Sequence, residues 1–385
     1  MADWTEGYVS DIEYQPGFYA EQTPAHLDIV CLLRAVEPPR RPGASFRYCE
    51  LGCGLADTAL TIAAANTHAE VMAFDFNPAH IARATALATE AGLANIHLEE
   101  ASFEDLVSGD RRDLGMFDYI VLHGVWAWVS AANRSHIVTF IRRHLKPGGL
   151  AQVTYNALPG WTPAMPMQRL FSMYASGVAD RSDKRIVGAI DVAQTFARAG
   201  SPAISAEFLG RVIKVRDEGK LAYLSHEYLN EHWSPFYQMD VARDLAGAKL
   251  GFVGTAMLFE NFPDLCLSAE QREIVDNAPA ALRETVTDYF MNRPFRRDVY
   301  ARGPRRIPDS RLDTLIRSLR LALVVPDKAI TRSIKVPLGE ASLSERFYAP
   351  ALDALREAPR TIGELIGLSE VAGSTVTPRE VLGML

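Results

Sequence analysis

The sequence predicts an α/β protein built on a parallel, doubly wound sheet, and two observations carry that prediction. Short runs of β-branched and aromatic residues alternate with helical periodicity from residue 46 to residue 155, which is the pattern of successive strand–helix units. Two of the strands end in a carboxylate, Glu50 and Asp75, and the first of these leads straight into a glycine turn. We expect a ligand at that edge, because such sheets bind ligands at the carboxyl ends of their strands.

The predicted strands and helices follow one another in a regular order. A helix is expected from Pro24 to about Ala35, because proline is favoured at the first helical position and Thr23 is a suitable N-cap. The proline-rich segment 38–43 then interrupts the chain. We expect strands at 46–50, 70–75, 95–99, 117–122 and 150–155, and helices at 57–66, 78–91 and 133–145.

After the last of these strands, helical periodicity replaces the strand pattern from residue 161 to about residue 232. A helix leading into a short strand returns at 241–254. We therefore expect residues 161–233 to form a helical insertion within a core made of residues 1–160 and 234–262. Such an insertion would serve as a lid or as the dimerisation element of a homodimer.

Residues 263–385 are predicted to form a separate, mainly helical C-terminal domain. The domain contains an arginine-dense segment at 293–306, which we interpret as a solvated or salt-bridged face. Its end, from residue 361 to residue 385, predicts two short helices of a winged-helix type. The chain stops inside an apolar helical run, so we expect the natural domain to continue and this one to be truncated.

The composition is that of a globular protein. Its 385 residues are 48% hydrophobic and 23% charged, which is typical of a folded chain with two or three domains. The sequence begins with no basic, apolar leader and has no run of ~20 apolar residues, so we expect a cytoplasmic protein with no membrane span. A net charge of −7 makes nucleic acid an unfavourable partner. The four cysteines have neither metal-ligand nor disulfide spacing, so no metal is expected.

The glycine turn lies in residues 48–56, Tyr-Cys-Glu-Leu-Gly-Cys-Gly-Leu-Ala. Gly52 and Gly54 would let the backbone approach a ligand closely. The turn has no third glycine at Asp57 and no Gly-Lys-Ser/Thr, so it fits neither a dinucleotide fingerprint nor a P-loop. Asp75 follows at close to the ~20-residue offset of a ribose-binding acid. A ligand with a ribose and an amino acid but no phosphate fits best, which predicts S-adenosylmethionine as cofactor and S-adenosylhomocysteine as product.

Each residue of this predicted site has a chemical role. Glu50 would orient the loop and bind the methionine amino group, and Asp75 would accept both ribose hydroxyls. The alternative for Asp75 is a helix N-cap before Pro78. Cys53 is interpreted as a small residue beside the ligand, and Ser102 as a contact of the adenine amine. The predicted cofactor-binding residues are Glu50, Gly52, Cys53, Gly54, Asp75, Phe76, Ser102, Phe103 and His123.

Aromatic and hydrogen-bonding residues follow the fourth and fifth predicted strands, in the segments 122–129 and 154–161. Because these strand ends would be adjacent, their side chains are expected to surround the transferable methyl group. We predict catalytic roles for His123, Tyr155 and Asn156, and contacts with the methyl acceptor for Trp126, Trp161 and Tyr14. Packing is the alternative for the aromatic residues, and for Trp128 we favour a core position.

These same segments resemble a known family. His123-Gly124-Val125-Trp126 and Tyr155-Asn156, followed by Pro159-Gly160-Trp161, are similar to signature segments of bacterial class I methyltransferases that carry a methyltransferase regulatory domain. The segments 22–24, 223–229 and 288–297 fit the same family. The resemblance implies a Rossmann-like methyltransferase core. It also implies an activity like that of its best understood members, which methylate lysines of bacterial outer-membrane proteins.

Three functions remain open. The first is a protein methyltransferase with lysine as acceptor, in which aromatic burial would depress the pKa of the amine, normally about 10.4, and His123 would take its proton. The second is a methyltransferase of a small molecule or natural product, with the insertion as a closed lid. The third is a non-enzymatic regulator that senses the cofactor and binds nucleic acid through the arginine segment. The depth of the pocket separates the first two, because a protein loop needs an open groove.

Overall fold

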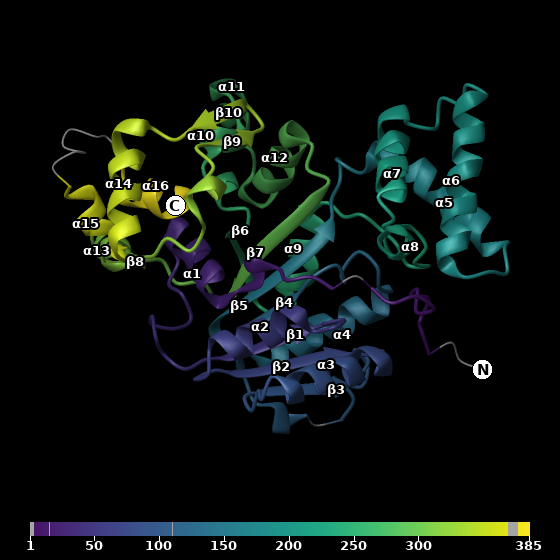
Figure 1. Ribbon diagram of the computed structural model, residues 1–385, viewed down its shortest axis with the longest axis horizontal. Coiled ribbons are helices and arrows are strands. Elements are labelled where there is room, and N and C mark those ends of the chain that lie inside the picture. The colour runs from purple at the N-terminus through teal and green to yellow at the C-terminus, as the bar shows by residue number, and fades with distance from the viewer. Residues whose placement is uncertain (1–3, 15, 110, 369–375) are drawn as a thin grey trace.

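A seven-stranded sheet forms the centre of the protein (Figure 1). The computed structural model describes residues 4–14, 16–109, 111–368 and 376–385. The strands are β1 (Arg47–Leu51), β2 (Glu70–Asp75), β3 (Ile96–Glu100), β4 (Phe117–Leu122), β5 (Leu145–Asn156), β6 (Leu250–Thr255) and β7 (Phe295–Arg302). They are arranged in the order β3-β2-β1-β4-β5-β7-β6. The strand order reverses at β1, which places the ends of β1, β2 and β4 around one crevice.

The first five strands are parallel, as the sequence predicts, but the sheet as a whole is mixed. Strand β7 pairs antiparallel with both β5 and β6. It lies inside the range 263–385, so our assignment of that whole range to a separate domain is wrong for residues 295–302. The charged residues Arg296, Arg297 and Asp298 break the alternation of apolar and polar residues that marks a strand.

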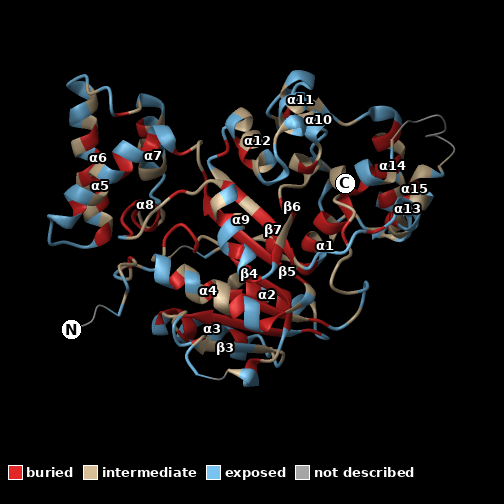
Figure 2. Cartoon of the chain, turned by 180° about the vertical axis from the view of Figure 1, so that it is seen from behind, coloured by how far each residue is buried: buried red, intermediate tan, exposed pale blue. Residues whose placement is uncertain are grey.

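Helices pack on both faces of the sheet. One face carries α1 (Pro24–Leu33), α2 (Asp57–Ala65) and α3 (Pro78–Glu90), and the other carries α4 (Ala131–His144) and α9 (Gln238–Ala246). Neighbouring residues of one strand serve opposite cores, since Tyr48 packs with the α1–α2 side and Cys49 with the α4 side. Figure 2 shows the strands as a buried layer between these helices.

Four helices between β5 and β6 form a unit with its own core. They are α5 (Met165–Ser176), α6 (Ser182–Arg198), α7 (Ala206–Asp217) and α8 (Leu221–Tyr228). Phe171, Ile186 and Tyr228 are buried among them. Figure 1 shows these helices to one side of the sheet, after which α9 and β6 bring the chain back to its edge. We call residues 161–233 the insertion.

The remaining elements lie beside the outer strands of the sheet and, from Asp309 on, at the end of the molecule away from the insertion (Figure 1). Before β7 come α10 (Pro263–Cys266), α11 (Ala269–Asn277) and α12 (Arg283–Met291). After it come α13 (Asp309–Ser318), β8 (Arg320–Leu321), β9 (Ser333–Val336), β10 (Gly339–Ser342), α14 (Glu345–Glu357), β11 (Arg360–Thr361), α15 (Ile362–Ile366) and α16 (Pro378–Met384). The two predicted terminal helices correspond to α15 and α16. Leu32 and Leu33 of α1 pack into the core of this region, which joins it to the sheet.

The arginine-dense segment is salt-bridged, which was one of our two interpretations, and its first part is buried whereas Arg305 and Arg306 are exposed. The Arg296 side chain is 1% exposed, and its guanidinium nitrogens lie 2.6 Å from Asp288, 2.8 Å from Asp298 and 2.9 Å from Glu284. Arg293 contacts the same Asp288 at 2.9 Å. Because Asp288 and Glu284 lie on α12 and Asp298 lies on β7, the buried charges hold that helix against the edge of the sheet.

This cluster yields a stability prediction. Arg296→Met removes the cation and leaves three carboxylates facing one another, so we expect a loss of about 3–5 kcal/mol of unfolding free energy. The control is Arg317→Met, which removes an exposed i,i+4 partner of Asp313 and should cost under about 1 kcal/mol. Urea unfolding followed by circular dichroism measures both. A shift for Arg296→Met no larger than that of the control would contradict the prediction.

Candidate cofactor and acceptor site

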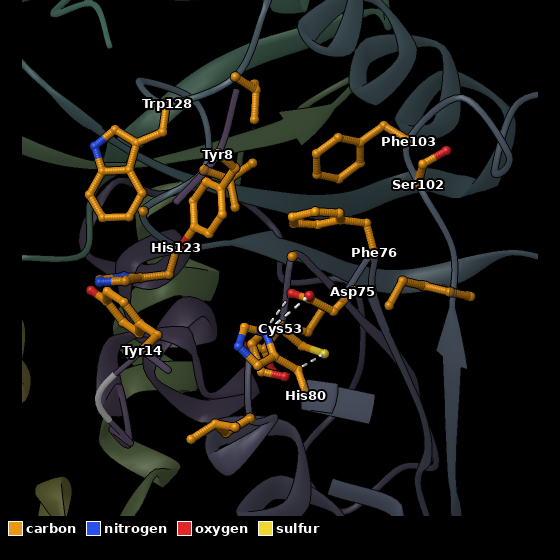
Figure 3. Close-up of a pocket in the computed structure, with 18 of the residues that line it drawn as sticks. Tyr8, Tyr14, Cys53, Asp75, Phe76, His80, Ser102, Phe103, His123 and Trp128 are labelled. Carbon is orange, nitrogen blue, oxygen red and sulfur yellow. Dashed lines mark hydrogen bonds and ion pairs between the residues drawn. The ribbon is translucent and has the colours of Figure 1, made fainter. Parts of the chain in front are cut away.

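A pocket opens at the carboxyl ends of β1, β2 and β4 (Figure 3). It encloses about 1110 Å³ including the part open to solvent, which is ample for a ligand the size of a nucleoside with an amino-acid tail. All nine predicted cofactor-binding residues line it, and so does Tyr14. Other residues that line the pocket include Glu6, Tyr8, Gly17, Tyr19, Asp57, Thr58, His80 and Trp128.

The glycine turn after β1 is held tightly against the end of β2. The backbone N–H groups of Gly52 and Cys53 both donate to the carbonyl oxygen of Phe74, at 2.8 and 3.0 Å. Gly52 has a φ of +67°, and a Cβ atom there would lie 2.6 Å from Val125. Only glycine meets both conditions, because an L-side chain is strained at that φ and has no room. At Gly52 the turn therefore presents bare backbone to the pocket, and Cys53 beside it contributes a small side chain.

Glu50 closes one side of the pocket with an unpaired carboxylate oxygen. The residue is 4% exposed, and its Oε2 atom makes no hydrogen bond within the part of the chain that the structure describes. Burial, together with the nearby charges of Asp57 and Asp75, raises the pKa of Glu50 to about 8. A buried acceptor of this kind fits the ammonium group of an amino-acid ligand, which would supply both the missing hydrogen bond and a positive charge.

Asp75 is the most heavily bonded carboxylate in the pocket. Its Oδ2 accepts from the N–H of Gly54 at 2.8 Å. Its Oδ1 accepts from the N–H of Asn77 at 3.0 Å and lies 3.2 Å from Nδ1 of His80. The cap of α3 is Asn77, whose side chain accepts from the N–H of Ala79, so the alternative role of Asp75 as N-cap is wrong. Residue types alone gave no reason to place His80 beside it.

The predicted adenine contact Ser102 lines the pocket, but its hydroxyl is already hydrogen-bonded to a neighbouring residue. The Ser102 hydroxyl donates to Asp105 at 2.7 Å and accepts from the N–H of that residue at 3.1 Å, so it is used within its own turn. Phe76 and Phe103 both face the pocket (Figure 3). Two apolar rings at this end suit a flat heteroaromatic base.

The pocket is lined by acidic residues. Glu6, Glu50, Asp57 and Asp75 all line it, although Glu50 holds a proton below about pH 8 in the free protein, and its described lining residues include no lysine or arginine. A field of one sign in a partly enclosed pocket attracts ligands of opposite charge. The arrangement favours a cationic ligand and opposes a phosphorylated one. It therefore suits S-adenosylmethionine, which carries a sulfonium and an ammonium, better than a dinucleotide.

His123 forms the pocket wall at the end of β4. Its ring stacks on Tyr19 with 3.7 Å between the ring centroids, and its Nδ1 atom has no partner among the described residues. Burial lowers the pKa of His123 to about 4, and Arg297 contributes in the same direction against the opposing effect of Glu21. The imidazole is therefore neutral at physiological pH, with one ring nitrogen available to a ligand.

Four residues predicted to surround the methyl group do not line the pocket: Trp126, Tyr155, Asn156 and Trp161. The Tyr155 hydroxyl donates instead to Asp298 at 2.7 Å, and the Asn156 amide donates to Glu227 at 2.8 Å. Trp126 is fully buried in the core of the sheet, and Trp161 packs in the core of the insertion. The placement that we predicted for these four side chains is therefore wrong, because each is engaged in packing or in a buried pair.

One residue of the pocket wall has two roles, and one segment of the wall was missed. Trp128 is buried in the core on the α4 side of the sheet, as we favoured, and it also lines the pocket. The N-terminal residues Thr5, Glu6, Tyr8, Gly17 and Tyr19 also line it, although the sequence predicts no regular structure for them. The signal that could have indicated them is their aromatic density, with Tyr8, Tyr14, Phe18 and Tyr19 in a short polar stretch.

Within residues 4–14, 16–109, 111–368 and 376–385, no group of three or more His, Cys, Asp or Glu side chains is placed to hold a metal ion. Within the same ranges, no helix has the length and apolar composition needed to cross a membrane. The acidic pocket is therefore the site on which a functional argument rests.

Comparisons of sequence extend these observations. Residues 43–198 match a methyltransferase domain, and residues 220–302 match a predicted methyltransferase regulatory domain. The second match ends at β7, whereas we predicted a regulatory domain at 263–385, so the two ranges share only residues 263–302. An uncharacterised protein of Synechocystis is 38% identical over 377 residues, covering 97% of this chain and 73% of that protein. An uncharacterised protein of Rickettsia prowazekii is 24% identical over 350 residues, covering 88% of this chain and 60% of its own length.

Comparison of structure points the same way. PKMT2 from Rickettsia typhi in complex with AdoHcy superposes on 96% of this chain and 73% of its own, with a TM-score of 0.66 and 19% sequence identity. The same protein without that ligand gives a TM-score of 0.65. These values establish a common fold. Together with the domain matches and the Synechocystis relative, they show that the chain belongs to the S-adenosylmethionine-dependent methyltransferases that carry a methyltransferase regulatory domain.

Proposed function

We propose that this methyltransferase transfers methyl groups to the side-chain amine of lysine residues in a protein substrate. The observation that carries the proposal is the acidic pocket, which has no cationic residue among its described lining and whose acceptor end is aromatic. That end suits an amine, which arrives as a cation and leaves as one. The similarity to PKMT2 of Rickettsia typhi and the resemblance of the signature segments support lysine as the amine.

In this proposal Glu50, the glycine turn and Asp75 hold the cofactor. Glu50 would bind the ammonium, and the backbone at Gly52 and Gly54 would pack against the amino-acid part. Asp75 would accept hydrogen bonds from the ribose hydroxyls with the lone pairs that its present partners leave. The bound cofactor supplies a methyl group on a sulfonium, which moves to the acceptor nitrogen by in-line displacement. The residues of the chain contribute alignment and exclusion of water, which can account for roughly 7–11 kcal/mol of the barrier.

The acceptor end is formed by Tyr8, Tyr14, Trp128 and His123. Tyr8 and Tyr14 pack on Trp128 with ring centroids 6.3 and 6.2 Å apart, so the three rings make one wall. A lysine amine enclosed by such rings loses hydration, which lowers its pKa and favours the neutral nucleophile. The low pKa of His123 makes it a weak base, so we assign it the role of accepting a hydrogen bond that orients the neutral amine.

The other two hypotheses receive less support. A methyltransferase of a small-molecule amine would need the same amine-binding end. Identifying the molecule that receives the methyl group therefore distinguishes this hypothesis from a protein methyltransferase. A regulator that binds nucleic acid needs free arginines in the segment 293–306. Arg293 and Arg296 are buried in ion pairs, Arg297 pairs with Glu21 at 2.9 Å, and Arg305 pairs with Glu37 at 3.1 Å.

The raised pKa of Glu50 predicts how cofactor binding depends on pH. Glu50 carries a proton below about pH 8 in the free protein, and an ammonium ligand requires the ionised carboxylate. Binding then releases a proton, so the affinity for S-adenosylhomocysteine should rise with pH between 6 and 8, by up to about tenfold per unit. Titration calorimetry in buffers of different ionisation enthalpy measures the proton. Glu50→Gln should bind weakly and lose this pH dependence; an unchanged slope would contradict the assignment.

His123 lines the pocket and Tyr155 does not, so we expect substitution of His123 to lower turnover and substitution of Tyr155 to lower stability. His123→Ala should lower turnover at least tenfold while changing affinity for S-adenosylhomocysteine by less than about tenfold, or ~1.4 kcal/mol, because the side chain faces the acceptor. The matched variant is Tyr155→Phe, which removes a hydroxyl bonded to Asp298 outside the pocket. It should keep turnover and lose about 1–2 kcal/mol of stability. Steady-state kinetics that show the reverse pattern would place the acceptor near Tyr155.

The acceptor itself can be identified directly. Incubating the enzyme and a bacterial lysate with S-adenosylmethionine labelled on its methyl group should place the label in protein, and peptide mass spectrometry should locate it on lysine. His123→Ala serves as the control for background transfer. Label found only in molecules that pass a small-pore filter would support the metabolite hypothesis and reject the lysine proposal.

A further inference from the structure

Residues 4–19, which we call the strap, form a wall of the pocket without forming a helix or strand in their described part. Three strap tyrosines line the pocket, and each packs on another residue that lines it. The ring centroid of Tyr8 lies 5.7 Å from Phe76, that of Tyr14 lies 6.2 Å from Trp128, and that of Tyr19 lies 3.7 Å from His123. Figure 3 shows Tyr8 and Tyr14 beside these partners. The strap thus covers the pocket from the base end to the acceptor end.

The outer side of the strap is bound to the insertion. The carboxylate of Asp11 accepts from both the N–H and the hydroxyl of Ser182, at 2.7 Å each. The N–H of Val9 donates to the Asn230 side chain at 3.0 Å, and Val9 itself is buried in the core of the insertion. The described residues of the strap pair with no strand, so hydrogen bonds to side chains such as that of Asn230 satisfy part of its backbone and hold it in place.

The two ends of the strap meet different parts of the protein. Near its end, the N–H of Gly17 donates to Asp57 at 2.8 Å and the N–H of Tyr19 donates to Thr58 at 3.1 Å. Asp57 and Thr58 open α2 directly after the glycine turn, and both line the pocket. The strap therefore runs from the insertion to the cofactor loop.

His226 of α8 is where the insertion meets the pocket tyrosines. Its ring lies 5.4 Å from that of Tyr8 and 5.0 Å from that of Tyr14, measured between centroids. Its Nε2 atom lies 3.1 Å from the carbonyl oxygen of Ile12, so a neutral ring can donate there. One fully buried side chain of the insertion thus contacts two residues of the pocket wall and the strap backbone.

We propose that Asp11 and His226 are positioning residues that keep the strap closed over the cofactor, so that the insertion controls cofactor affinity. A segment held by a few hydrogen bonds and rings opens at low free-energy cost. If only the closed strap binds cofactor tightly, the apparent dissociation constant equals the intrinsic one divided by the closed fraction. Contacts made by the insertion then change binding in a pocket that the insertion itself does not line. The inference holds for any methyl acceptor.

Asp11 is the residue to test, because it is exposed and its replacement leaves every core intact. Asp11→Ala should weaken S-adenosylhomocysteine binding about three- to tenfold in calorimetry, and Asp11→Asn should restore part of the loss because its amide oxygen still accepts from Ser182. The matched control is Asp180→Ala, which removes a carboxylate beside the start of α6 that pairs with Lys184 and not with the strap. It should bind as the wild type does.

Limited proteolysis gives a second measurement that does not depend on activity. The strap has no lysine or arginine but has Tyr8, Tyr14, Phe18 and Tyr19, so chymotrypsin can report on its opening. Cleavage in the strap should be faster in Asp11→Ala than in the wild type, and saturating S-adenosylhomocysteine should slow it in both. His226→Gln, which keeps a donor at the position of Nε2, should resemble the wild type more closely than His226→Leu. Equal affinity and equal cleavage in Asp11→Ala and the wild type would overturn the proposal, as would cleavage that the ligand does not affect.

Discussion

The enclosed guanidinium of Arg296 is the constraint on which the arrangement around the sheet edge depends. A buried cation has to be neutralised, and the groups that do so come from α12 and from β7 itself. They join α12 to β7, the strand that lies between β5 and the outer strand β6. The Tyr155 hydroxyl is drawn into the same cluster through Asp298. Tyr155, which we predicted to be catalytic, therefore helps to connect β5 with β7.

The part of the pocket that we assign to the cofactor and the part that we assign to the acceptor are built from different kinds of structure. The cofactor side is built from strand ends and a turn, where Phe74, Asp75 and the glycines fix one another through backbone hydrogen bonds. The side that we propose for the acceptor is built from side chains on loops and on the strap. Rigid scaffolding suits a ligand shared by a whole family, whereas loops can vary with the acceptor. The acidic lining is shared by the two sides, and it suits the positive charge of the cofactor and of the amine that we propose as acceptor.

The parts that could be predicted from the sequence are those whose cause is local. Strands β1–β4, helices α1–α3 and the glycine turn follow from periodicity, caps and turn chemistry within a few neighbouring residues. Strand β7 was missed because the reason for its charges is a partner on another element. The misplacement of Trp126 has a similar origin: it follows β4 in a loop, where no period assigns a side to its side chain. The strap depends on contacts such as that of Asp11 with Ser182, which are 171 residues apart in the chain.

The strap also bears on how the chain can be divided. Domain matches treat the methyltransferase part and the regulatory part as separable modules, but one wall of the cofactor pocket is folded by both. Val9 belongs to the core of the insertion, while Tyr19 belongs to the site of the sheet. In evolutionary terms, the strap and the insertion are expected to change together. In protein engineering, a chimera that exchanges the insertion between relatives has to exchange residues 4–19 with it.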